Sequence, residues 1–149
     1  MDRKPHNHSK PTLENLVRLG SLWLTVQIVA TTLRLFGMKS AEAVGDFLSL
    51  FISCPKPRSG LGADFQMAQT CVQSVAAAAN RSIVPATCLP RAITTKSILK
   101  AVGIEVDICI GVGRDEEKGF NAHAWVELDS MPISESPDLT LRFSEISRL

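Results

Sequence analysis

A change of hydrophobic period near residue 103 constrains the fold more than any other feature of the sequence. Before that point, apolar residues recur at three-to-four spacing, which is typical of helices. After it, residues 104–112, "IEVDICIGV", alternate strictly between aliphatic and other residues, as a half-buried strand does. The sequence therefore predicts an α+β fold, with helices first and a small antiparallel sheet after them.

The predicted sheet is a meander of short strands. A second alternating run, "AHAWVELD" at 122–129, follows the charged loop "GRDEEKG", so the two runs should form an antiparallel hairpin. Asp129 and Ser130 can make a tight turn into a short third strand, "MPIS". Cys109 falls on the face of the first strand that points away from the aliphatic side chains.

The most apolar stretch, residues 13–36, predicts a long helix. Only fifteen uncharged residues separate Arg18 from Arg34, which is short of the roughly 18 to 20 needed to span the hydrocarbon core. We therefore expect a buried or membrane-surface helix. Thr12 is a suitable N-cap and Gly37 a suitable residue just beyond the C-terminus.

Two further helical patterns complete the first part of the chain. One begins with Ser40 as a candidate N-cap, and the other covers 63–80 and includes Cys71 on its apolar face, where a core thiol is expected. A Pro/Gly loop at 54–62 lies between them and divides the chain into an N-terminal helical hairpin, 1–62, and a core, 63–149, which together should form one compact unit. The apolar face expected for the first of these helices consists of Val44, Phe47, Leu48 and Phe51.

Charge and cysteine spacing exclude several classes of function. With 16 basic and 15 acidic residues, the chain has no overall field that would attract nucleic acid, and the string "HNH" at 6–8 lies in a tail bounded by prolines. The cysteines show no C-x-x-C pair, so no structural zinc site or other metal site is predicted. No secretory signal precedes them, which favours the cytoplasm and reduced thiols.

Cys88 is the residue that most favours an enzyme. Thr87 is an allowed N-cap, Pro90 is tolerated in a first helical turn, and Gly103 can end the helix, so Cys88 should open a helix. The positive end of the helix dipole and the free N–H groups there stabilise a thiolate and could also stabilise an oxyanion. Taken alone, Cys88 would more often be a small buried residue of the core.

His123 strengthens the hypothesis because it follows on a strand of the predicted meander. A cysteine, a histidine and an acid that orients the imidazole together form a nucleophile, a base and an orienter. Glu135 is the best-placed acid, with Asp138 and then Asp129 as alternatives.

Several neighbours are candidates for substrate contacts. Trp125 shares a strand face with His123 and could wall the site, or it could be an ordinary core indole. Arg91 could hold a substrate carbonyl or carboxylate, although surface helix arginines are common. No motif identifies a second oxyanion donor among the glutamines upstream of the cysteine. These glutamines are Gln66, Gln69 and Gln73.

The stretch "TCLPRAITTKSILKAVGIEVDICIGVGRDEEKGFNAHAWVELDSMPI" resembles the transglutaminase-like cysteine protease domain of lasso-peptide biosynthesis, the leader peptidase of microcin-processing type. The matching elements are C-L-x-R-A at a helix start, G-I at its end, the I-G-V strand end and A-H-A-W-V-E, within roughly 70–140. The resemblance implies a papain/transglutaminase-like core in which Cys88 is the nucleophile and His123 the base. Glu135 would be the third member, where this chain has Ser134-Glu135 and the family usually has Asn-Asp.

The resemblance also implies chemistry and partners. The reaction would be amide hydrolysis through a thioester, without a metal or an organic cofactor. The chain is similar to the stand-alone form, which lacks the leader-recognition domain and needs a separate RiPP recognition element protein, a precursor peptide and an ATP-dependent lasso cyclase. The apolar N-terminal helices could dock a partner or a membrane surface, which would make the cytoplasmic protein peripheral.

Two other functions stay open at the level of sequence. The same triad could transfer an acyl group to an amine, as true transglutaminases do. Alternatively, the chain could be a catalytically weak module that binds a partner, an interpretation favoured by the Ser134-Glu135 departure.

Overall fold

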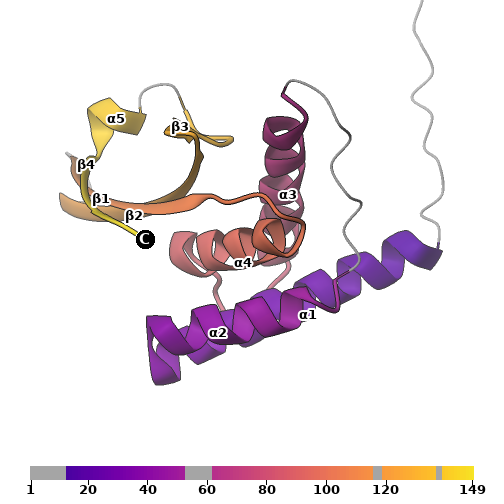
Figure 1. The fold of residues 1–149 in the computed structure, drawn as a ribbon. Coiled ribbons are helices and arrows are strands. Elements are labelled where there is room, and N and C mark those ends of the chain that lie inside the picture. Colours follow the sequence, from indigo (N-terminus) through magenta and orange to yellow (C-terminus); the bar gives the residue numbers. More distant parts are fainter. Residues whose placement is uncertain (1–12, 53–61, 116–118, 137–138) are drawn as a thin grey trace, which may run out of the picture.

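The computed structural model describes residues 13–52, 62–115, 119–136 and 139–149, and it confirms the predicted α+β order of helices followed by an antiparallel sheet (Figure 1). The tail with the "HNH" string, Thr12, Cys54 and Asp138 lie outside the described residues. The elements are α1 (Leu13–Phe36), α2 (Met38–Ser49), α3 (Ala63–Ala79), α4 (Cys88–Ala101), β1 (Asp107–Asp115), β2 (Gly119–Leu128), β3 (Met131–Pro132), α5 (Leu139–Arg142) and β4 (Ser144–Arg148).

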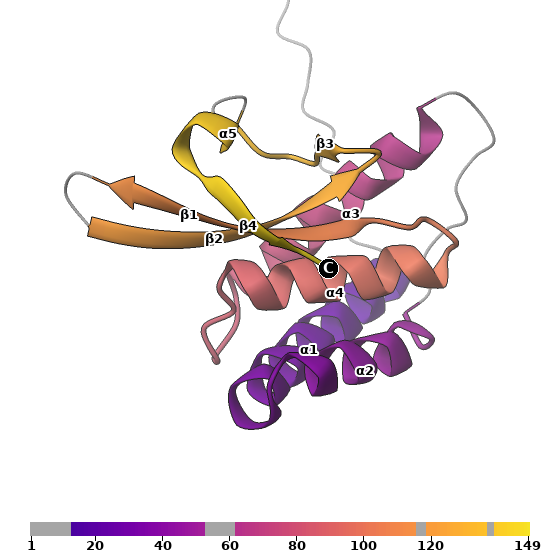
Figure 2. The same ribbon diagram turned by 60° about the vertical axis from the view of Figure 1, so that its left-hand side comes forward.

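Helix α4 lies at the centre of the molecule. The sheet covers one side of it, and the antiparallel pair α1 and α2 covers the opposite side (Figures 1 and 2). α4 contacts α1, α2 and α3 as well as β1 and β2, so nearly every turn of it is buried. This central position explains why α4 has no strong apolar stripe: a helix that is covered all round need not be amphipathic.

One hydrophobic core joins the helical part to the sheet. It contains Val26 and Val29 of α1, Leu99 of α4 and Ile108 of β1, none of which is more than marginally accessible to water. Residues from both sides of position 62 therefore share a single core. The expected division at 62 stays a prediction.

The junction between α1 and α2 differs from the prediction in one respect. Gly37 has a φ of 80°, ends α1 as expected and also serves as the N-cap of α2, which therefore starts at Met38. The predicted cap at Ser40 is wrong. Its hydroxyl instead donates to the carbonyl of Phe36 at 3.2 Å, a bond that links the first turn of α2 to the last residue of α1.

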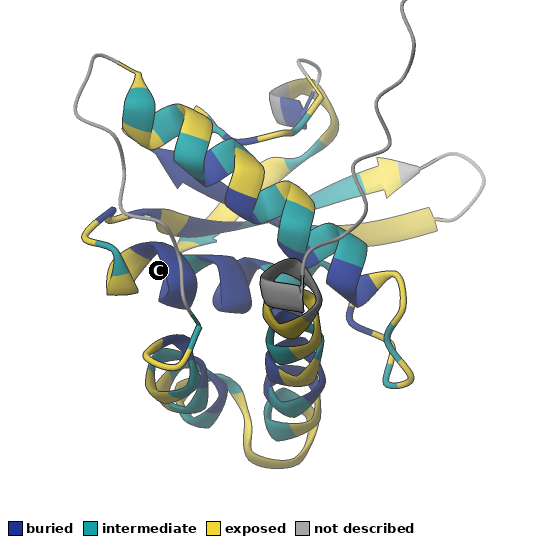
Figure 3. Cartoon of the chain, turned by 90° about the vertical axis from the view of Figure 1, so that its right-hand side faces the viewer, coloured by how far each residue is buried: buried dark blue, intermediate teal, exposed yellow. Residues whose placement is uncertain are grey.

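The apolar pattern expected for α2 is buried only in part, since Val44 and Leu48 are half-buried and the two phenylalanines are exposed. Phe47 and Phe51 are 60% and 71% exposed, while the buried residues are Ala41, Gly45 and Ser49. Figure 3 shows buried, intermediate and exposed residues around both α1 and α2, so each helix is only partly covered. The small residues of α2 are the buried ones because α2 lies close to α4. A Cβ at Gly45 would lie 2.7 Å from Ser97 Oγ, so no side chain fits there without movement.

Helix α1 contains the one described segment that is long and apolar enough to cross a membrane by length and composition, Val17–Phe36. A third of its residues are buried inside the protein, among them Leu22, Val26 and Ala30. A core helix of a soluble protein meets the same criteria, so the segment is weak evidence for a membrane span.

The sheet has the strand order β3-β2-β1-β4 with antiparallel pairing throughout. The predicted hairpin of β1 and β2 is confirmed, with Gly111 opposite His123 in the register. The turn at Asp129 and Ser130 is also confirmed, because both have positive φ, 50° and 64°, as a two-residue hairpin turn of type I′ requires. The third strand is shorter than expected, only Met131–Pro132.

The far side of the sheet carries a second, smaller core that the sequence did not predict. Its members are Cys109, Trp125 and Leu139, with Phe143 packed against them. Helix α5, which was not expected, brings Leu139 over this face, and the equally unexpected β4 extends the sheet beside β1. Cys109 does point away from the aliphatic face, as predicted, but into this core rather than into solvent.

Candidate active site

Cys88 is the first residue of α4, as the capping pattern predicts. Thr87 occupies the N-cap position with extended backbone, although its hydroxyl makes no capping bond, and Pro90 is buried in the first turn. The first N–H groups of a helix have no partner within the helix itself. The sulfur of Cys88 therefore lies beside backbone donors and the positive end of the helix dipole.

His123 on β2 meets Cys88 from the sheet. The hydrogen bond between the two side chains is the largest influence on the Cys88 thiol and lowers its pKa, against the opposing effect of burial. Backbone hydrogen bonds from Ala124 and Leu89 lower the pKa further. These contacts stabilise the thiolate, which is the nucleophilic form of cysteine.

The pKa of the His123 imidazole shifts in the opposite direction, upward. Hydrogen bonds to Cys88 and then Glu135 raise the pKa of His123 to about 9, although burial works against the charged form. The lowered pKa of the thiol and the raised pKa of the imidazole both favour the thiolate–imidazolium pair over the neutral pair.

Glu135 approaches the outer side of the same imidazole, with 3.3 Å between its Oε1 and His123 Nε2. It follows Ser134, whose φ of 57° turns the chain back toward β2 after β3. Because Nε2 faces the carboxylate, Nδ1 is the ring nitrogen left for the thiol. Asp129, an alternative orienter, lies six residues along β2 from His123, about 20 Å at ~3.3 Å per residue.

The imidazole of His123 packs against two aromatic rings, those of Trp125 and Phe143. Trp125 stacks at 6.1 Å between ring centroids with an interplanar angle of 18°, and Phe143 lies at 5.2 Å. Trp125 is 4% exposed, and its indole N–H donates to Glu127 at 2.9 Å. Gly111 leaves room for this indole, because a Cβ there would lie 2.9 Å from it. Sequence patterns gave no signal for Phe143 or for the role of Gly111.

A cavity of about 450 Å³ opens in front of Cys88 and His123. Helix α3 forms one wall, the first turns of α4 form the floor, and β2 and the segment after β3 form the other sides. The lining residues are Val72, Ala76, Thr87, Cys88, Arg91, Ala92, Thr95, His123, Ala124, Trp125, Val126, Ser134 and Glu135.

Trp125 and Arg91, both predicted as substrate contacts, line this cavity but also have structural partners. The guanidinium of Arg91 donates to the carbonyl of Ala86 at 2.8 Å and to Asn80 Oδ1 at 3.0 Å, which ties the segment before α4 to the end of α3. A substrate contact for either side chain stays a prediction. None of the three upstream glutamines lines the cavity.

The other described thiols lie elsewhere. Cys71 is buried on α3, where a core thiol was expected, and burial raises the pKa of Cys109 to about 12. The Sγ of Cys109 lies near carboxylates of Glu127 and Glu145, a grouping of atoms that could hold a metal ion. However, Arg148 already pairs with both carboxylates, since it contacts Glu127 Oε2 at 2.8 Å and Glu145 Oε2 at 2.9 Å.

A thiol at a helix N-terminus, hydrogen-bonded to a histidine on the following antiparallel sheet, defines the class of cysteine-dependent acyl-transfer proteins. The comparison with protein families agrees with this class. The model of the transglutaminase-like superfamily matches residues 33–148, most of the chain, and the protein therefore belongs to that superfamily. This membership indicates a protein of cysteine protease or acyltransferase type. No curated protein and no solved structure matches the chain significantly.

Proposed function

We propose that this protein is a cysteine peptidase that cleaves the leader from a lasso-peptide precursor. The observation that supports this best is the hydrogen-bonded series of Cys88, His123 and Glu135 at the edge of an open cavity. The motifs around Cys88 and His123 support the peptidase within the wider superfamily, as does the match to the superfamily itself.

In the proposed reaction, the Cys88 thiolate attacks the carbonyl carbon of the scissile amide and forms a tetrahedral oxyanion. The N–H groups of the first turn of α4 would stabilise that charge. The His123 imidazolium then donates its proton to the amine that leaves, and a thioester of Cys88 remains. Neutral His123 next removes a proton from water, which attacks the thioester, releases the carboxylic acid and restores the thiolate.

Glu135 would hold the imidazole in the orientation that this proton transfer needs. Its carboxylate accepts from Nε2–H, which keeps Nδ1 directed at the sulfur and stabilises the imidazolium. The carboxylate is the proposed counterpart of the aspartate of the leader-peptidase motif.

The proposed partners are the precursor peptide, a separate recognition element protein and the lasso cyclase. Large apolar side chains that are exposed on α1, on α2 and just after α2 support a docking role for these helices, with the protein cytoplasmic or peripheral at a membrane. Co-purification with the recognition protein and flotation with anionic vesicles would separate the two forms of docking. The exposed side chains concerned are Leu24, Leu35, Phe47, Leu50 and Phe51.

Acyl transfer is the second proposed function, because membership of the superfamily supports it equally and the same thioester can react with an amine instead of water. A primary-amine probe added to the cleavage reaction distinguishes the two. A product that carries the amine at the new carboxyl end would favour transfer, and free acid alone would favour hydrolysis. The third alternative, a weak binding module, predicts neither product.

The decisive experiment incubates the protein with the precursor and recognition protein encoded beside its gene and detects released leader by mass spectrometry. Cleavage should disappear in Cys88→Ala and His123→Ala, which remove the nucleophile and the base. Equal cleavage by the wild type and Cys88→Ala would refute the catalytic function.

A further inference from the structure

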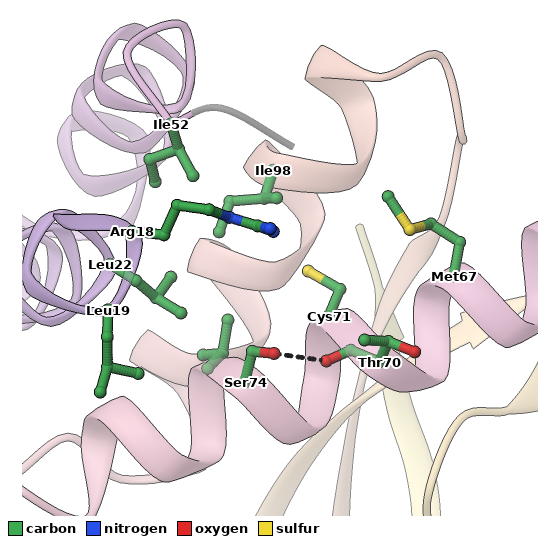
Figure 4. A pocket seen from close by; sticks show the side chains of 10 residues that line it. Arg18, Leu19, Leu22, Ile52, Met67, Thr70, Cys71, Ser74 and Ile98 are labelled. Atoms are coloured by element: carbon green, nitrogen blue, oxygen red, sulfur yellow. Dashed lines mark hydrogen bonds between the residues drawn. The ribbon is translucent and has the colours of Figure 1, made fainter. Parts of the chain in front are cut away.

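Helix α3 separates the catalytic cavity from a second cavity. Val72 and Ala76 face the catalytic side. The second cavity has a volume of about 300 Å³ and lies between α1, α3 and α4 near the end of α2 (Figure 4). It is lined by Arg18, Leu19, Leu22, Ile52, Met67, Thr70, Cys71, Ser74, Val75 and Ile98.

The walls of this second cavity are mostly apolar, and one cation lies over it. Leu22, Val75 and Ile98 are core side chains that supply a hydrophobic base. The Arg18 side chain extends from α1 across the cavity (Figure 4). Among the residues that the structure describes, its guanidinium makes no hydrogen bond or ion pair. An apolar pocket beside an uncompensated guanidinium suits an apolar group with a carboxylate close by.

The exposed face of α3 connects the two cavities. Successive helix residues are about 100° apart, so Gln66, Gln69 and Gln73 lie on the side of α3 that runs from one cavity to the other over the outer surface. Each glutamine amide can both donate to and accept from the backbone of an extended peptide. The glutamines therefore offer a polar path between the two cavities.

We propose that the second cavity is an exosite for the peptide substrate, a site that binds an apolar side chain of the substrate while Arg18 pairs with an acidic group beside it. The peptide crosses α3 over the three glutamines and enters the catalytic cavity on the other side. This inference rests on the proposed peptidase function, because it deepens the description of the substrate.

The width of α3 sets the distance along the peptide between the residues bound in the second cavity, called here the anchor residues, and the scissile bond. A helix with its side chains is about 10–12 Å across, so half of its circumference is about 17 Å. An extended chain advances about 3.3 Å per residue. The anchor residues should therefore lie roughly five residues or more from the cleaved bond.

Binding measured apart from cleavage tests the exosite. A fluorescent copy of the precursor peptide is titrated, with the recognition protein present, into the Cys88→Ala protein and its Arg18→Glu double variant. We expect the charge reversal to raise Kd roughly tenfold, as loss of an ion pair together with added repulsion would. Lys39→Glu is the matched control: it makes the same charge change at an exposed position that lines neither cavity.

A second pair of variants tests the cavity itself. Thr70→Trp fills its mouth from an exposed position of α3 and should also weaken binding, whereas Thr70→Val keeps the volume and should not. Acidic residues of the peptide are then changed to lysine one at a time. One such peptide should recover affinity for Arg18→Glu, a rescue that a merely structural Arg18 would not produce.

The outcomes separate the exosite from the peptidase. Unchanged Kd in Arg18→Glu and Thr70→Trp overturns the exosite, even where the wild type cleaves normally. If binding weakens in these variants as expected but the wild type does not cleave the precursor, the exosite stands and the peptidase function is overturned.

Discussion

The carboxylate of Glu135 lies 3.3 Å from Nε2 of His123, and it comes from the segment after β3 rather than from a strand that neighbours the histidine in sequence. Both side chains are about a quarter exposed, 26% and 28%. The pair is therefore partly solvated and relies on the position of a short backbone segment. Its contribution to the orientation of the imidazole is open to measurement.

The first prediction concerns the reactivity of two of the described thiols, Cys88 and Cys109. The pKa of Cys88 is lowered, so its thiolate forms at a pH below the ordinary value of about 8.5 and persists as pH rises. Iodoacetamide should therefore alkylate Cys88 rapidly at neutral pH, while Cys109, which is fully buried, stays unmodified until the protein unfolds. Mass spectrometry of labelled peptides across about pH 5 to 9 measures both rates.

His123→Ala provides the control for this prediction. Without the hydrogen bond from the imidazole, the pKa of Cys88 should rise, and the alkylation profile should move to higher pH. If His123→Ala left the pH profile of Cys88 alkylation unchanged, the proposed ion pair would be contradicted.

The pH profile of cleavage by the wild type should be bell-shaped. Activity should rise as Cys88 deprotonates and fall as His123 deprotonates near pH 9.

The second prediction concerns the acid. Glu135→Gln removes the charge but keeps an acceptor oxygen, whereas Glu135→Ala removes the acceptor as well. We therefore expect kcat to fall in Glu135→Gln and to fall further, by about ten- to a hundredfold, in Glu135→Ala. This range corresponds to the ~1.5–3 kcal/mol of a hydrogen bond to a charged group. Asp129→Asn is the matched control, because it removes a carboxylate from the distant turn. If both variants kept wild-type kcat, Glu135 would have no part in orienting the imidazole.

The third prediction uses the close approach of Gly111 to Trp125. Gly111→Ala should destabilise the fold by about 1–3 kcal/mol, since the new Cβ would lie 2.9 Å from the indole and push it against the rings around His123. Thermal or urea denaturation measures the loss. Gly20→Ala is the contrast: nothing lies within 4 Å of its Cβ in an exposed part of α1, so stability should rise by about 0.5–1 kcal/mol.

The fourth prediction concerns the backbone that carries the acid. Ser134 has a φ of 57°, a conformation that asparagine tolerates better than serine and β-branched residues tolerate poorly. Ser134→Asn should raise the free energy of unfolding by up to about 1 kcal/mol, and Ser134→Val should lower it. Denaturant titration of the two variants would show equal stability if this backbone conformation were not adopted in solution.

Local patterns in the sequence determined the start of α4, the hairpin of β1 and β2, and the turn at Asp129 and Ser130. Each depends on interactions between residues close together in the chain: a proline in a first helical turn, side chains alternating across a strand, and two residues able to adopt positive φ. Cys88, His123 and Glu135 could be named for the same reason, because each lies in or beside such an element.

Only the tertiary structure decided which surfaces met. Helix α2 buries its small residues because α4 passes close to Gly45, and this leaves Phe47 and Phe51 exposed against their own periodicity. Strand β4 pairs with the far edge of β1, a contact between distant segments that no local pattern encodes. The same long-range packing brings Phe143 against His123 and places Arg18 over a cavity bounded by α3. Close packing of a shared core, rather than the preference of any one segment, fixed these features.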